Sequence, residues 1–170
     1  MPGFYQPGEY DVSGTIVGVV EKGKILDVFK SAIQICRSKA EEKKIDIHPI
    51  CEAQLTSWFD SSLLEQAVVN LLDNAIKYSE PNSTIHLKAN LENLEMKIIV
   101  EDRGIGIAKK HLPRLFERFY RVDKARSRNL GGTGLGLAIV KHIAQAHGGN
   151  VTVESTLGEG SVFTIHLPEK

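Results

Sequence analysis

The segment 70–78, NLLDNAIKY, combines an apolar helical pattern with polar side chains spaced about one turn apart. Helix interiors disfavour asparagine, because its amide competes with the backbone for hydrogen bonds. At about 100° per residue, Asn70, Asn74 and Lys77 fall within about 60° of helix surface, roughly opposite a bulky apolar face. Such a helix packs one side on a sheet and points its polar groups into a cleft. Amide oxygens suit a magnesium ion, and an ammonium group suits a phosphate.

Pairs of the form Gly-x-Gly occur at four places and raise the question of a dinucleotide-binding loop. That loop needs a third glycine, or an alanine, three places after the second glycine. Other residue types occupy the place each time: Lys109, Leu137, Ile139 and Phe163. The segment 18–25, GVVEKGKI, matches P-loop spacing, but Ile25 replaces the Ser or Thr that binds magnesium. We therefore predict neither loop.

The chain has 170 residues, 42% of them hydrophobic and 25% charged, with 21 basic and 21 acidic side chains. These values predict one globular domain without a general attraction to nucleic acid or to an anionic membrane. Cys36 and Cys51 are expected to be buried free thiols in a reducing compartment. No apolar run reaches the roughly 18 residues that span a bilayer. We expect a cytoplasmic domain, with the parent protein anchored in the cell membrane by another part.

The elements that would position the polar helix follow from periodicity and turn residues. Residues 1–20 are rich in proline and glycine and are expected to be a linker or a cloning remnant. A long helix with Asp60 as its N-cap carries NLLDNAIKY. Further helices are expected over 25–43, 109–119 and 135–147. Strands are expected over 45–50, 55–59, 83–91, 95–102, 150–156 and 161–167.

This order of elements suits an open mixed sheet of about five strands with three main helices on one face. The predicted fold class is therefore an α/β (α+β) two-layer sandwich. The least structured interior stretch is 121–134, RVDKARSRNLGGTG, which is polar, basic and glycine-ended. Long loops inside compact domains are usually functional or disordered.

Five segments resemble, in order, the N, G1, F, G2 and G3 boxes of the catalytic ATP-binding domain of bacterial sensor histidine kinases. They are NLLDNAIKYS (70–79), VEDRGIGI (100–107), LFERFYRVD (115–123), GGTGLGLAIVKH (131–142) and LGEGSVFT (157–164). This domain belongs to the GHKL superfamily, shared with Hsp90, type II topoisomerases and MutL, and has the Bergerat fold. The resemblance makes residues 21–170 the catalytic domain, and its lid segment is most similar to phosphate-regulon-type sensor kinases.

The resemblance implies bound ATP and Mg²⁺. Asn74, together with Asn70, would hold the metal, while Lys77 would meet a phosphate and Tyr78 would lie over the adenosine. Asp102 ends an apolar strand, and a carboxylate only accepts hydrogen bonds. Since the exocyclic amine of adenine donates, this aspartate would select adenine, as it does in the family.

Glycine-rich turns are expected to complete the nucleotide site. Gly104 and Gly106 would let the backbone approach the base, and Ile107 would wall it. The GGTGLG segment leads into a helix whose free N–H groups suit phosphates. Thr164 is expected to assist adenine recognition through water. The resemblance places these residues of the G2 box at the nucleotide: Gly132, Thr133, Gly134, Leu135, Gly136 and Leu137.

Residues 108–134 are expected to form a mobile lid that orders over ATP. Within this lid, the resemblance favours Arg121 for the γ-phosphate, with Arg118 next. The lid's aromatic residues are expected to pack it on the core rather than contact the ligand: Phe116, Phe119 and Tyr120.

The chain departs from the ATP-hydrolysing members at Asn70, where those members have a glutamate general base. An amide cannot take the proton, so we predict little intrinsic ATPase activity, as is typical of histidine kinases. None of the six histidines lies in a phosphoacceptor motif. The expected function is donation of γ-phosphate to a histidine on a separate dimerisation and phosphotransfer domain, which serves a cognate response regulator. The alternatives are an ATP-sensing module without phosphotransfer and an anti-sigma-factor type serine kinase.

Overall fold

The computed structural model describes residues 9–10, 16–122 and 134–169. Within them, one sheet has five strands in the order β4-β6-β7-β9-β8, with only the β4–β6 pair parallel. Its strands are β4 (Asp46–Ile50), β6 (Thr84–Glu92), β7 (Glu95–Asp102), β8 (Asn150–Thr156) and β9 (Gly160–Pro168). This arrangement confirms the predicted mixed sheet.

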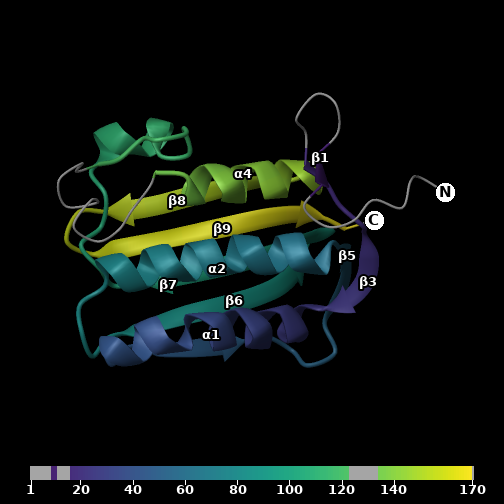
Figure 1. Cartoon of the computed structure of the whole chain (residues 1–170), viewed down its shortest axis with the longest axis horizontal. Coiled ribbons are helices and arrows are strands. Elements are labelled where there is room, and N and C mark those ends of the chain that lie inside the picture. Colours follow the sequence, from purple (N-terminus) through teal and green to yellow (C-terminus); the bar gives the residue numbers. More distant parts are fainter. Residues whose placement is uncertain (1–8, 11–15, 123–133, 170) are drawn as a thin grey trace.

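Three long helices lie across one face of this sheet, and α2 lies between the other two (Figure 1). They are α1 (Ile25–Glu42), α2 (Ser61–Tyr78) and α4 (Gly136–Ala146). The helices predicted over 25–43 and 135–147 are confirmed to within one residue at each end. The two-layer α/β sandwich is therefore confirmed as well.

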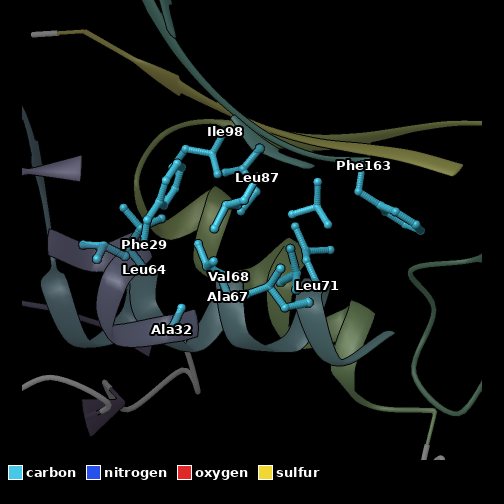
Figure 2. Close-up of a cluster of buried hydrophobic side chains, with 14 of the residues drawn as sticks. Phe29, Ala32, Leu64, Ala67, Val68, Leu71, Leu87, Ile98 and Phe163 are labelled. Atoms are coloured by element: carbon cyan, nitrogen blue, oxygen red, sulfur yellow. The ribbon is translucent and has the colours of Figure 1, made fainter. Parts of the chain in front are cut away.

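The core lies between the helices and the sheet. Leu64, Val68 and Leu71 of α2 are each 0% exposed. Figure 2 shows their side chains directed toward the sheet residues Leu87 and Ile98. Burial of a side chain of this size contributes about 1.5–3 kcal/mol to the free energy of unfolding. The rotation of α2 about its axis is thus fixed by its apolar face.

One predicted strand does not join the main sheet. The strand expected over 55–59 is β5 (Thr56–Phe59), and it pairs antiparallel with β3 (Glu21–Lys24) in a separate two-stranded sheet. The P-loop-like segment is therefore extended where it forms β3. Within the expected N-terminal linker, β1 (Glu9–Tyr10) pairs with β2 (Ile16–Val17).

The helix expected over 109–119 is shorter than predicted. The structure has a 3-10 helix, η1 (Lys109–Arg114), which contains Pro113. Proline has no N–H to continue a helix, and its ring clashes with the preceding turn. Phe119 has φ of 65°, which no right-handed helix contains. The longer prediction was wrong, because it did not take account of Pro113.

Asp60 is the N-cap of α2, as predicted, and also connects two other segments. Its Oδ1 accepts from the backbone N–H of Leu63 at 2.9 Å, and its Oδ2 accepts from that of Val19 at 2.6 Å. Its own backbone N–H donates to Nε2 of His147 at 2.9 Å. His147 Nδ1 in turn donates to the carbonyl of Ile143 at 2.8 Å. With a side chain 1% exposed, Asp60 joins α2, the end of α4 and the N-terminal segment.

We predict that Asp60→Ala lowers the free energy of unfolding by about 2–4 kcal/mol, because it removes a helix cap and leaves two N–H groups unpaired. Urea denaturation measures this change. Asp46→Ala, at an exposed aspartate, is the matched control and should stay within about 0.5 kcal/mol of the wild type. A loss no larger than the control's would contradict the structural role of Asp60.

Candidate functional site

A cavity of about 810 Å³ opens at the C-terminal end of α2. Its wall includes Asn70, Asn74, Lys77 and Tyr78 from α2 and Asp102 from the end of β7. These residues were predicted to hold a metal, a phosphate, the adenosine and the base. The structure brings all five to one cavity, since the core fixes α2 with this side outward.

Asn70 carries a polar atom that the fold does not satisfy. Its Nδ2 is buried and has no hydrogen-bond partner among the described residues. Nearly all buried polar atoms in proteins are paired, and leaving one unpaired costs about 1–3 kcal/mol. A ligand that presents oxygen atoms to this side of α2 would supply the missing partner. The cavity therefore fits a polar, oxygen-rich group beside Asn70.

Asp102 lies at the end of β7 with 6% of its surface exposed. Its Oδ1 accepts from the backbone N–H of Gly104 at 2.8 Å. Burial raises the pKa of the Asp102 carboxyl, while backbone N–H groups of Gly104 and Ser161 act in the opposite direction. A carboxylate kept partly desolvated in a cavity is a strong acceptor for a donor group on a ligand.

Ser161 lies in this site and was missed by the sequence analysis, whereas Thr164 was predicted there and is not. Ser161 pairs with Asp102 in the register of β7 and β9, is buried, and lines the cavity. Side chains alternate along a strand, so Ser161 shares the helix-covered face with Phe163 and Ile165. Thr164 projects from the opposite face. The alternation of Phe163, Ile165 and Leu167, which the sequence shows, already assigns Thr164 to the other face, whereas the pairing of Ser161 with Asp102 depends on the antiparallel register.

Gly104 and Gly106 allow three segments to meet beside Asp102. A Cβ on Gly104 would lie 2.2 Å from the carbonyl oxygen of Tyr78, and one on Gly106 would lie 2.1 Å from that of Thr156. Gly106 also has φ of 72°. Larger residues would push the end of α2 and the β8–β9 hairpin away from the cavity.

The far wall of the cavity comes from the segments on either side of residues 123–133. Ile107 and Arg121 line it before that segment, and after it come Gly134, Leu135, Gly136 and Leu137. The backbone N–H of Phe119 donates to the carbonyl of Gly134 at 2.8 Å, so these two segments are joined directly. Arg118 is exposed and does not line the cavity. Gly132 and Thr133 lie outside the described residues, as do three basic residues of the expected lid, Lys124, Arg126 and Arg128.

The aromatic residues of this region take different places. Phe116 packs edge-on against Phe163 of the core, with ring centroids 6.2 Å apart, as predicted. Phe119 is 67% exposed, so the prediction that it packs on the core was wrong. Tyr120 lines the cavity, and its hydroxyl contacts Nδ1 of His111, which also lines it.

Two lysines at the C-terminal end of α1, Lys39 and the C-cap residue Lys43, contact α2 near the cavity, and neither was predicted from the sequence. Lys39 Nζ lies 2.7 Å from Oδ1 of Asp73, and both side chains line the cavity. Lys43 Nζ donates to three carbonyl oxygens at the end of α2, those of Ile76 at 2.7 Å, Lys77 at 3.2 Å and Ser79 at 2.7 Å. A cation suits these carbonyls, since they carry the negative end of the helix dipole.

The sandwich and its cavity define a class of nucleotide-binding domain, and sequence comparison identifies the family. Residues 59–170 match the family described as histidine kinase-, DNA gyrase B-, and HSP90-like ATPase. The chain belongs to this family, as the catalytic domain of a sensor histidine kinase.

Known relatives and structures agree with this assignment. The chain is 52% identical over 110 residues to the sensor-like histidine kinase SenX3 of Mycolicibacterium smegmatis, which covers 65% of this chain and 29% of SenX3. A mycobacterial sensor histidine kinase, MprB, superposes with a TM-score of 0.74 at 29% identity, covering 89% of this chain and 99% of the MprB chain. The catalytic domain of the histidine kinase ThkA has the same fold, with a TM-score of 0.78 at 22% identity, covering 89% and 96%.

The chain spans about a third or less of the length of the curated relatives it matches. In the part of the chain that the structure describes, no helix combines the length and the apolar character needed to cross a bilayer.

We predict that Lys43→Met lowers the free energy of unfolding by about 1–2 kcal/mol, because it keeps the apolar stem of the side chain but leaves the end of α2 uncapped. Amide hydrogen exchange should be faster at residues 76–79 than in the wild type. Lys30→Met, at an exposed position of α1, is the matched control. Equal exchange at residues 76–79 in both variants would contradict the capping role.

Proposed function

We propose that this domain binds Mg-ATP in the cavity and donates the γ-phosphate to a histidine on a separate domain of its parent protein. The observation that carries the proposal is the meeting of the α2 amides and Lys77 with the buried Asp102 in a single cavity. The family comprises histidine kinase-, DNA gyrase B- and HSP90-like ATPases, and the curated relatives are named as sensor histidine kinases. The separate domain would be the dimerisation and phosphotransfer domain, and the next recipient a cognate response regulator.

The residues of the cavity fit the parts of Mg-ATP. Asp102 would accept from the adenine amine, with Ser161 beside it, and Tyr78 would lie over the adenosine. Lys77 and Arg121 would contact phosphates. The start of α4 also lines the cavity and carries partial positive charge, which suits an anion.

The metal would be held mainly by amide and phosphate oxygens. No group of three or more His, Cys, Asp or Glu side chains suited to a metal occurs among residues 16–122 and 134–169. Magnesium takes oxygen ligands and keeps several waters, so Asn74 and Asn70 would need to supply only one or two. When bound, the ion would neutralise charge on the phosphates.

The amide of Asn70 also limits the chemistry of this domain. It cannot accept a proton from water, so hydrolysis of bound ATP should be slow. Little γ-phosphate would therefore be lost to water before its transfer to the acceptor histidine. Within this chain His147 is unsuited to be that acceptor, because it is buried and both of its ring nitrogens are hydrogen-bonded.

We predict that Asn74→Ala reduces transfer of γ-phosphate to a separately supplied phosphoacceptor domain of the parent by about a hundredfold or more, because it removes a metal ligand. Radiolabelled Mg-ATP and acid-labile label on the acceptor measure the transfer. Asn90→Ala, at an exposed asparagine of β6, is the control and should transfer like the wild type.

Three outcomes separate the alternatives. A wild-type domain that binds no nucleotide at millimolar Mg-ATP would refute the proposal. Binding without transfer would indicate an ATP-sensing module, and acid-stable label would indicate a serine kinase. Wild-type transfer by Asn74→Ala would remove the metal assignment alone.

Adenosine affinity should fall as the pH is lowered from neutral through the titration of the Asp102 carboxyl. The raised pKa of Asp102 means that its charge is lost at higher pH than for an ordinary aspartate, and the protonated form is a poorer acceptor. Adenosine avoids the titration of phosphate groups, and calorimetry measures its dissociation constant. Asp102→Asn should weaken binding at neutral pH by about tenfold or more and remove the dependence on pH. Glu101→Gln, at the adjacent half-buried position, should keep a dependence on pH because Asp102 remains, and a flat wild-type profile through the titration of Asp102 would contradict the assignment.

A further inference from the structure

A row of three charged side chains crosses from α1 to α2 along the wall of the cavity. Lys39 Nζ lies 2.7 Å from Oδ1 of Asp73, and Lys77 Nζ lies 3.5 Å from Oδ2 of the same carboxylate. All three residues line the cavity. Their side chains are 60%, 23% and 27% exposed, for Lys39, Asp73 and Lys77 in that order. Asp73 therefore faces the cavity between two ammonium groups.

Asp73 is unfavourable for a site that binds a triphosphate. A carboxylate near several phosphate charges repels them, and the repulsion is stronger where protein excludes water. Among the described lining residues, three carry a fixed positive charge and two a carboxylate: Lys39, Lys77, Arg121, Asp73 and Asp102. Without Lys39 the cavity would have two charges of each sign.

The two ion pairs of Asp73 differ in strength. The contact with Lys39 has the length of a charge-assisted hydrogen bond, and this bond raises the pKa of the Lys39 ammonium group. The contact of Asp73 with Lys77 is 3.5 Å long, which is 0.8 Å longer than the 2.7 Å contact with Lys39. Lys77 can therefore turn from Asp73 to a phosphate while Asp73 keeps its closer partner.

We propose that Lys39 is a positioning residue of the nucleotide site: it neutralises Asp73, leaves Lys77 free to bind phosphate, and so raises the affinity for the triphosphate. This inference rests on the proposed function. It assigns to α1 a part in the phosphate site, although the motifs that predicted that site begin only at Asn70.

A simpler role for Lys39 is direct contact with a phosphate, and the two roles predict different results in double variants. If Lys39 acts through Asp73, its loss matters only while Asp73 is charged. If Lys39 touches phosphate, its loss costs the same whether residue 73 is Asp or Asn. A double-mutant cycle over these two positions measures the difference.

The experiment is calorimetric titration of ATP and of adenosine into the wild type, Lys39→Gln, Asp73→Asn and the double variant. Lys39→Gln should weaken ATP binding by about fivefold, and more at low salt, because an exposed ion pair is screened. Its adenosine affinity should be unchanged. Asp73→Asn should bind ATP at least as tightly as the wild type, and adding Lys39→Gln to it should cost nothing further. Lys97→Gln, which removes a half-buried lysine that lies 3.8 Å from Glu92 and outside the cavity, controls for loss of surface charge.

The inference is overturned if Lys39→Gln binds ATP like the wild type, or if it costs the same factor in both backgrounds. It is also overturned if adenosine affinity falls in parallel with ATP affinity, since that result would indicate a general structural defect. A wild type that binds no ATP would instead refute the proposed function, and this inference with it. Thermal unfolding of each variant shows whether it is folded.

Discussion

The rotational setting of α2 is the constraint on which the rest of the site depends. Leu64, Val68 and Leu71 are fully buried against the sheet, so the helix cannot turn without exposing them. Their burial forces Asn70 and Asn74 to the opposite side, where the cavity lies. The core thus supplies the orientation that the amides themselves could not, because isolated polar side chains gain little from facing either solvent or a cavity.

The two ends of α2 are held by different means, which suit their different surroundings. At the buried N-terminal end, Asp60 satisfies backbone N–H groups from two segments and binds a third through His147. At the cavity end, Lys43 covers the last carbonyls, and the carbonyl of Tyr78 accepts from the N–H of Ile105 at 3.2 Å. The first end is a cap inside the core, whereas the second joins the helix to the turn after β7. The wall of the cavity is consequently continuous from α2 to Asp102.

The sequence predicted those features that local patterns determine. The helix with its Asp60 cap, the alternating strands and the glycine turns each depend on residues close together in the chain. The separate β3–β5 pair, Ser161 and Lys39 depend on contacts between distant segments, for which a single sequence carries no signal. Thr164 is a different case, because the alternation of Phe163, Ile165 and Leu167 in the sequence already predicts that Thr164 faces away from the helices. The five predicted residues of α2 and β7 line one cavity. Their orientation could be predicted because the hydrophobic periodicity of each element shows which of its faces is buried.

The site contains two polar groups whose burial destabilises the fold when no ligand is bound. Among the described residues the buried amide nitrogen of Asn70 has no hydrogen-bond partner, and Asp102 carries a charge that burial disfavours. A core of this size can tolerate such costs, and natural proteins place them where a ligand removes them. A ligand that satisfies both groups binds only the folded chain, so its binding free energy also stabilises the fold. Adenine at one end of the cavity and phosphate oxygens at the other meet these two requirements together, which neither a free base nor inorganic phosphate can do.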